Sequence, residues 1–237
     1  MKEQLKKILK DPLKFGAACF FFFIICCFYP VNSFLSRSVF LLAFGLFWLS
    51  PYIAGLRSKK CVFVHLLLTV GLLLAPGIIF PNKSSDEFKK LYLKNLQSFE
   101  GVSYFWGGEN FIGIDCSGLA RKSLINSYFY SGQLTKAFST WWYDCSAKAL
   151  AENYRDYTVN VCSFSSLREV DYSKISAGDM AVTASGIHVI VYLGNNKWIQ
   201  ADPEQGKVVV EDPAATRSSW FDVKVNIVRW KVLEDLP

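Results

Sequence analysis

The stretch IDCSGL, residues 114–119, decides how the second half of this chain folds and what chemistry it can perform. It follows a loop rich in aromatic residues and glycine, YFWGG at 104–108, and it precedes a run of residues that predicts a helix. Cys116 therefore lies in the first turn of that helix. Unpaired backbone N–H groups and the positive end of the helix dipole favour a thiolate there, so Cys116 is a candidate nucleophile.

A cysteine nucleophile needs a base, and the chain contains only two histidines. His65 lies within a long apolar run, which leaves His188 as the candidate base. If residues 194–196 form the loop after its strand, His188 lies opposite Asp202 and diagonal to Gln200, on one face of the sheet. A two-residue turn would send Gln200 to the other face. Gln200 and Asp202 are therefore the two candidates for orienting the imidazole, and we favour Gln200.

Three stretches in the first third of the chain carry no charged residue. Each is close to the roughly 20 apolar residues that cross a bilayer, so the sequence predicts three transmembrane helices, at about 15–36, 38–56 and 61–80. Lysines precede the first stretch, and basic residues separate the second from the third. The positive-inside rule then predicts a multi-pass protein of the inner (cytoplasmic) membrane, with a cytoplasmic N-terminus and a periplasmic or extracellular catalytic domain.

The formal charge of +6 owes much to the N-terminal lysines, so no nucleic-acid partner is expected. Beyond residue 82 the pattern of apolar residues changes along the chain. It has helical spacing over 86–99, after Cys116 and over 133–153. It then predicts strands, at 180–183, 188–193, 197–201, 207–211 and 223–232, with a further short strand at 158–161. We therefore expect a membrane anchor over 1–82 and an α+β domain with an antiparallel sheet over 83–237.

Three of the seven cysteines lie in the predicted α+β domain. An exported domain meets an oxidising compartment, where Cys145 and Cys162 could pair and leave Cys116 as the odd thiol. A zinc site formed by the three cysteines and His188 is the alternative, although the chain has no C-x-x-C pair. No other cofactor or metal is indicated.

Four motifs resemble those of the NlpC-type papain-like cysteine peptidases of bacterial cell walls. They are YFWGG at 104–108, DCSGL at 115–119, AGDM at 177–180, and a run from HV at 188–189 through YLGN at 192–195 to WIQA at 198–201. Any one of them is weak evidence, but their order and spacing together are specific. The match extends from about residue 99 to residue 201, over two fifths of the chain.

The resemblance implies a compact domain with helices packed on a small antiparallel sheet, and it implies roles for single residues. Cys116 is the nucleophile, His188 is the base, and Gln200 is the third polar residue, where the family often has histidine. Tyr104 lines the site near the oxyanion. The other substrate-binding residues that we expect are Trp106 in the same loop, and Asp115 and Ser117 beside the nucleophile.

The expected function is that of a membrane-anchored cysteine peptidase, a hydrolase that cuts peptidoglycan stem peptides between D-glutamate and a diamino acid through a thioester. Its expected partners are the stem peptides, the lipid bilayer and proteins of the envelope. An amidase, deamidase or acyltransferase acting on a lipid or protein remains an alternative, favoured by a pocket lined by Trp106, Trp141 and Trp142. The favoured interpretation of Trp141 and Trp142 is core packing. A non-catalytic envelope assembly protein, with Cys116 as a structural thiol, is the third possibility.

Overall fold

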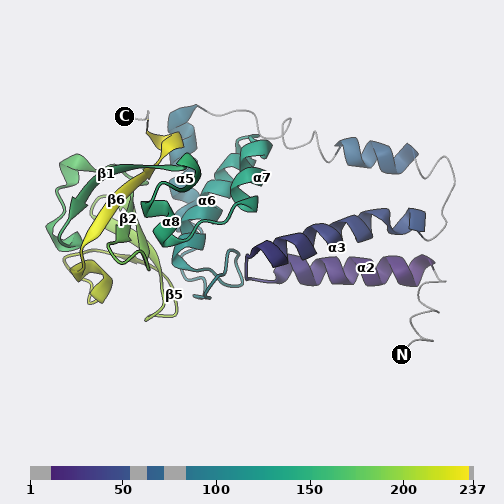
Figure 1. Ribbon diagram of the computed structural model, residues 1–237, viewed down its shortest axis with the longest axis horizontal. Coiled ribbons are helices and arrows are strands. Elements are labelled where there is room, and N and C mark those ends of the chain that lie inside the picture. Colours follow the sequence, from purple (N-terminus) through teal and green to yellow (C-terminus); the bar gives the residue numbers. More distant parts are fainter. Residues whose placement is uncertain (1–11, 54–62, 72–83, 235–237) are drawn as a thin grey trace.

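The computed structural model describes residues 12–53, 63–71 and 84–234. Residues 84–234 form an α+β domain, and a pair of helices extends away from it (Figure 1). The pair consists of α2 (Pro12–Phe28) and α3 (Phe34–Ile53), which lie side by side. Their contact is largely aromatic, because the ring of Phe23 packs against those of Phe40, Phe44 and Phe47.

One antiparallel sheet of six strands forms the centre of the α+β domain, in the order β1-β6-β2-β3-β4-β5. Its strands are β1 (Thr158–Phe164), β2 (Met180–Thr183), β3 (Val189–Gly194), β4 (Lys197–Asp202), β5 (Lys207–Glu211) and β6 (Val225–Trp230). Each strand overlaps a run that residue alternation predicts. The predicted α+β class with an antiparallel sheet is therefore confirmed.

Four helices of this domain pack around the sheet: α5 (Ser85–Gln97), α6 (Cys116–Tyr130), α7 (Leu134–Trp142) and α8 (Ala147–Ala151). α5 begins with a capping box, in which Ser84 and Glu87 bond each other's backbone N–H groups. The single helical pattern predicted over 133–153 is two helices, because residues 143–146 are not helical.

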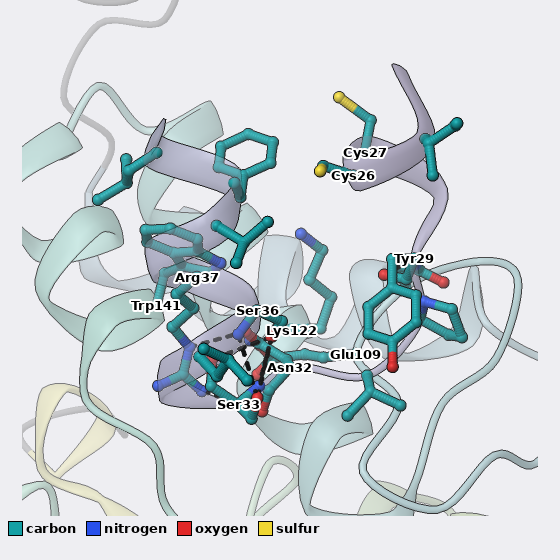
Figure 2. A pocket seen from close by; sticks show the side chains of 18 of the residues that line it. Cys26, Cys27, Tyr29, Asn32, Ser33, Ser36, Arg37, Glu109, Lys122 and Trp141 are labelled. Atoms are coloured by element: carbon teal, nitrogen blue, oxygen red, sulfur yellow. Dashed lines mark hydrogen bonds between the residues drawn. The ribbon is translucent and has the colours of Figure 1, made fainter. Parts of the chain in front are cut away.

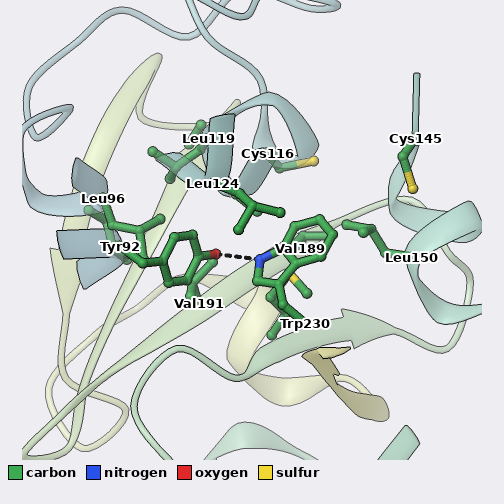
Figure 3. Close-up of a cluster of buried hydrophobic side chains, with 14 of the residues drawn as sticks. Tyr92, Leu96, Cys116, Leu119, Leu124, Cys145, Leu150, Val189, Val191 and Trp230 are labelled. Atoms are coloured by element: carbon green, nitrogen blue, oxygen red, sulfur yellow. Dashed lines mark hydrogen bonds between the residues drawn. The ribbon is translucent and has the colours of Figure 1, made fainter. Parts of the chain in front are cut away.

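The main core lies between the helices and one face of the sheet (Figure 3). α6 contributes Leu119 and Leu124, which are buried together with Val189 of β3. Trp230 on β6 donates a hydrogen bond from Nε1 to the hydroxyl of Tyr92 on α5, at 2.8 Å. These contacts fix α6 against the sheet, and the first turn of α6 carries Cys116.

A second buried cluster covers the opposite face of the sheet, as the alternation of side chains along the strands requires. Cys162 packs against this cluster, whereas Cys145 is buried in the main core. Both are free thiols. The possible Cys145–Cys162 disulfide is therefore not formed, because the sheet separates the two side chains.

The prediction of three transmembrane helices is also wrong. No helix within the described ranges is both long enough and apolar enough to cross a bilayer. The uncharged run 15–36 does not form one helix: α2 ends at Phe28, and the residues around Pro30 are not helical. With 17 residues, α2 is about 25 Å long, short of the roughly 30 Å hydrocarbon core.

The second and third predicted spans lie partly outside the described residues, at 54–56, 61–62 and 72–80. α3 carries Arg37 in its first turn, and residues 63–71 are helical. The predicted location was multi-pass in the inner membrane, with a cytoplasmic N-terminus and the catalytic domain beyond the membrane. It was inferred from the three spans, so the same finding overturns it.

Candidate active site

Cys116 is the first residue of α6, as the sequence predicts. Its side chain is 8 % exposed. The thiol donates a weak hydrogen bond to the carbonyl of Ile187, with 3.9 Å from Sγ to O. The backbone N–H of Val189 donates a hydrogen bond to the sulfur, which lowers the pKa of the thiol. The residues on both sides of His188 therefore contact the candidate nucleophile, which brings the histidine's strand to the start of α6.

Asp115 caps α6 and ties its first turn to the glycine-rich loop. Oδ1 of Asp115 accepts hydrogen bonds from the N–H of Gly118, at 2.5 Å, and from the hydroxyl of Ser117, at 3.0 Å. Oδ2 accepts from the N–H of Gly107, at 2.9 Å. One carboxylate thus holds both the helix start and the loop that precedes it, and this fixes the position of the Cys116 sulfur.

Replacing Asp115 with alanine is expected to lower the free energy of unfolding by about 2 kcal/mol, the upper end of the range for a lost N-cap. The reason is that two backbone N–H groups lose their acceptor together. Urea unfolding followed by circular dichroism measures the change. Ser146→Ala is the matched control, because Ser146 caps α8 with a single 3.3 Å bond to Ala149 and should cost less. Equal losses in the two variants would contradict the double role of Asp115.

His188 and Gln200 form a buried pair beneath the start of α6. Nε2 of His188 lies 2.6 Å from Oε1 of Gln200. The exposed fractions of the two residues are 2 % and 0 %. Gly194 pairs with Lys197, so the β3–β4 turn has two residues and not the three that were expected. A bulge between Tyr192 and Gly194 nevertheless gives the pairs Val191–Ile199 and Tyr192–Trp198 the register predicted for His188 and Gln200. That register accounts for the contact between His188 and Gln200.

Burial determines the protonation of both candidate catalytic groups. It raises the pKa of the Cys116 thiol to about 12, and the nearby Asp115 carboxylate adds to the rise. Backbone N–H groups around the sulfur lower the pKa but do not offset burial. Burial also lowers the pKa of His188 below its usual 6.5, against the hydrogen bond to the Oε1 of Gln200 and the charge of Asp202, which raise it. The resting pair is therefore a neutral thiol and a neutral imidazole, not the thiolate that the helix position alone predicts.

The rate of Cys116 alkylation by iodoacetamide is expected to rise with pH through a midpoint below 6.5. The neutral imidazole is the form that accepts the thiol proton, and protonation of His188 as the pH falls through its lowered pKa removes that base. Alkylation quenched at timed intervals, followed by peptide mass spectrometry, measures the rate at Cys116 alone. His188→Ala should lose this rise. A midpoint above 6.5 would contradict the lowered pKa of His188.

Trp220, which the sequence does not predict as a site residue, covers the histidine. Its ring stacks on that of His188, with centroids 4.3 Å apart and planes 22° apart. Trp220 belongs to the short helix η4 (Ser219–Asp222), in a region without a predicted element. No motif contains it, and only the packing of η4 reveals it. The indole shields the imidazole from solvent and fixes its plane.

A cavity of about 340 Å³ opens above the thiol. It is lined by all five sequence-predicted residues outside the His188–Gln200 pair: Tyr104, Trp106, Asp115, Cys116 and Ser117. Trp106 is 81 % exposed at its edge. His188 and Gln200 do not line the cavity and lie behind it. The cleft therefore brings together five of the predicted site residues, and the buried His188–Gln200 pair lies outside its lining.

Three charged residues that the sequence analysis did not identify also line this cavity. They are Glu109, Arg121 and Asp144. Arg121 is 2 % exposed and forms ion pairs with Glu109, at 3.2 Å, and with Asp144. They come from a loop, from α6 and from the start of the α7–α8 connection, so no local motif links them.

The α2–α3 connection forms a wall of the same cavity, through Val31, Asn32 and Ser33. Asn32 donates its N–H to the carbonyl of Gly107, at 2.8 Å, and Glu109 donates its N–H to the carbonyl of Pro30, at 3.0 Å. Arg37 of α3 is 2 % exposed and donates to the carbonyl of Trp142, at 2.7 Å. The N-terminal helices are therefore attached to the loop that precedes the nucleophile.

A second cavity, of about 610 Å³, lies between α2, α3 and the domain (Figure 2). Trp141 lines it, whereas Trp106 lines the cavity at Cys116. Trp141 and Trp142 pack edge-on against Phe40 and Phe34 of α3. Both tryptophans are half-buried, belong to neither buried cluster and pack against α3, so the predicted core packing is not what the structure shows. Trp106 and Trp141 line different cavities, so no single cavity lined by the described residues contains all three tryptophans.

Several solved structures are similar to this chain in part. An NlpC/P60 family protein from Bacillus cereus is 18 % identical, with a TM-score of 0.42, and the match covers 64 % of this chain and 41 % of that one. RipB, a peptidoglycan hydrolase from Mycobacterium tuberculosis, is 20 % identical with a TM-score of 0.39, over 65 % of this chain and 70 % of that one. NlpC1 from Trichomonas vaginalis is 18 % identical with a TM-score of 0.39, over 61 % and 44 %. The chain thus spans about two fifths of the first of these structures.

No curated protein matches the chain. The model of the NlpC/P60 family matches residues 101–225, which is more than half of the chain. This range contains the glycine-rich loop, Cys116, His188 and Gln200, and it covers every strand up to the start of β6. The chain therefore belongs to the NlpC/P60 family.

Proposed function

We propose that this protein is a cysteine peptidase that hydrolyses peptidoglycan stem peptides. The observation that carries the proposal is the thiol of Cys116 in the first turn of α6, on the floor of a cavity and against the strand of a buried His188–Gln200 pair. Membership of the NlpC/P60 family supports it, as do the four motifs that resemble those of cell-wall peptidases.

In the proposed reaction the Cys116 thiol gives its proton to His188 as the sulfur attacks the carbonyl carbon of the scissile amide. The backbone N–H of Cys116 and the hydroxyl of Tyr104 stabilise the oxyanion. Burial raises the pKa of Tyr104 to about 12, with further rises from Cys116 and Asp115, so its hydroxyl keeps the proton that it must donate. His188 then protonates the leaving amine, and water hydrolyses the thioester.

The proposed substrate bond joins the side-chain carboxyl of D-glutamate to a diamino acid. Asp115 and Ser117 would lie near the amino end of the stem peptide, and Trp106 would cover the rim of the cleft. The Asp115 carboxylate would then place a negative charge beside the positively charged amino group of the stem peptide. This assignment of the bond rests on the resemblance to cell-wall peptidases.

Digestion of purified muropeptides by the full chain, with products identified by mass spectrometry, tests the proposal. The expected products are fragments split after D-glutamate, absent from a parallel digest with a variant that lacks the Cys116 sulfur. Cleavage at another amide would keep the peptidase and change the bond. If a folded protein with a reactive Cys116 released no product, the peptidoglycan substrate would be excluded.

A further inference from the structure

We propose that Glu211 is a positioning residue for the His188–Gln200 pair. Its carboxylate fixes Gln200 in the orientation that makes Nδ1 of His188 the basic nitrogen. Glu211 ends β5, and Oε2 of Glu211 lies 2.5 Å from Nε2 of Gln200. The inference rests on the proposed use of His188 as the base, but not on the identity of the substrate.

The side-chain amide of Gln200 has one orientation that its neighbours permit. Nε2 can only donate hydrogen bonds, and Oε1 can only accept them. Oxygens of Asp202, Glu211 and Ser218 surround Nε2, at 3.5, 2.5 and 3.3 Å. A flipped amide would turn its own oxygen toward two carboxylates, so the orientation shown is the one that the surroundings permit.

The protonation of His188 follows from that orientation. Oε1 of Gln200 faces Nε2 of His188 at 2.6 Å, so Nε2 must carry the hydrogen. In a neutral imidazole the other nitrogen, Nδ1, then holds the lone pair. A base that receives the Cys116 proton needs such a lone pair. The chain of contacts from Glu211 through Gln200 thus selects one tautomer.

Glu211 fits this role better than Asp202, the other carboxylate near the amide. Asp202 is 3.5 Å from Nε2 of Gln200 and also accepts the N–H groups of Glu204, at 2.7 Å, and Gln205, at 3.4 Å. The other carboxylate oxygen of Glu211, Oε1, accepts hydrogen bonds from the side chains of Thr216 and Gln205. The stronger contact to the amide and the fixed carboxylate both assign the positioning role to Glu211.

A charge next to the amide also compensates for a weakness of glutamine as a third residue. A neutral amide orients an imidazole but does not stabilise the positive charge that the imidazole acquires with the thiol proton. The charged groups that face the His188–Gln200 pair are Asp202 of β4 and Glu211 of β5. Asp202 raises the pKa of His188, and the Glu211 carboxylate polarises the Gln200 amide that His188 contacts.

Nitrogen-15 NMR of the full chain labelled at histidine tests the inference directly, since the chain contains only His65 and His188. The spectrum of His188→Ala assigns the signals. The parent protein is expected to show the Nε2–H tautomer of His188, and Glu211→Gln is expected to add a population of the Nδ1–H tautomer. A parent that shows the Nδ1–H tautomer, or a Glu211→Gln spectrum identical to that of the parent, would overturn the inference.

Alkylation of Cys116 by iodoacetamide gives a second readout that needs no substrate. Glu211→Gln should slow it by at least roughly tenfold at neutral pH, the size expected for loss of one hydrogen bond to a charged group. The midpoint of the rise with pH should also fall, because the imidazolium loses a stabilising charge. Glu211→Asp, which keeps the charge, should recover part of the rate and shows that the position tolerates substitution.

Glu204→Gln is the matched control, because Glu204 is an exposed carboxylate bonded to Ser219 and does not contact Gln200. It should alkylate at the parental rate. Where muropeptides are cleaved, Glu211→Gln should lower kcat and leave KM unchanged. If they are not cleaved, the alkylation rates and the tautomer still decide the role of Glu211, so failure of the proposed substrate and failure of this inference are separate results.

Discussion

The Cys116→Ala variant is expected to cleave muropeptides at least roughly 10³-fold more slowly than the parent, with no product above background. The sulfur is the atom that forms the thioester, and water bound in its place is a far weaker nucleophile. The fold should persist, because alanine keeps the Cβ in the buried first turn of α6 and removes only the sulfur. Product release followed by mass spectrometry gives the rate, and urea unfolding gives a change of roughly 1 kcal/mol or less.

Cys145→Ala provides the matched control for this result. Cys145 is also a buried free thiol, 2 % exposed, and burial likewise raises its pKa to about 12. It does not line the cavity at Cys116. The Cys145→Ala variant should therefore keep the parental activity. Equal loss of activity in both variants would show that removal of any buried thiol disrupts the protein, and residual activity in Cys116→Ala would exclude the thioester.

Gly118→Ala is expected to destabilise the protein by about 2 kcal/mol and to impair the cleft, the reverse of the usual effect of this change in a helix. A methyl group on Gly118 would lie 2.3 Å from the carbonyl oxygen of Gly108 and 3.0 Å from Oδ1 of Asp115. The carbonyl of Gly108 cannot retreat easily, because it accepts the N–H of Asp115 at 3.0 Å. The glycine-rich loop would have to move away from α6.

Urea unfolding of Gly118→Ala measures this loss, and the alkylation rate of Cys116 reports the state of the cleft. Gly45→Ala is the control, because Gly45 lies within α3 and a methyl group there meets nothing within 4 Å. The control should be neutral or slightly stabilising, as alanine is a better helix former. A Gly118→Ala protein as stable as the parent would mean that the loop and the helix are less tightly packed than described.

The local elements of the fold could be predicted because their causes are local. Ser84 and Glu87 form the capping box of α5, and Asp115 caps α6, through bonds between residues three apart in the sequence. The asparagines at 195 and 196 adopt positive φ angles in the two-residue β3–β4 turn, and a bulge between Tyr192 and Gly194 gives the rest of the hairpin the predicted register. The contact between His188 and Gln200 follows from that register by counting residues.

The failures have a common cause, since each depends on packing between segments far apart in the sequence. An uncharged run predicts apolar surroundings but not a continuous helix, and the break after Phe28 in α2 arises where the chain pairs with the glycine-rich loop. Trp220 reaches His188 only through the folding of η4. The position of Glu211 near Gln200 could have been predicted from the strand pattern. Glu211 lies two residues beyond Val209, the partner of Gln200, and therefore on the same face of the sheet.

Because residues 30–32 are bonded to the loop 107–109, the width of the cleft depends on the N-terminal region. This segment bonds the loop through backbone groups and contributes Val31, Asn32 and Ser33 to the cavity wall. A recombinant protein that begins at residue 84 therefore has a cleft open on one side. Because the segment is tethered, its effective concentration at the loop is on the order of millimolar. A free peptide of the same sequence would be needed at a similar concentration to close the cleft of the truncated protein.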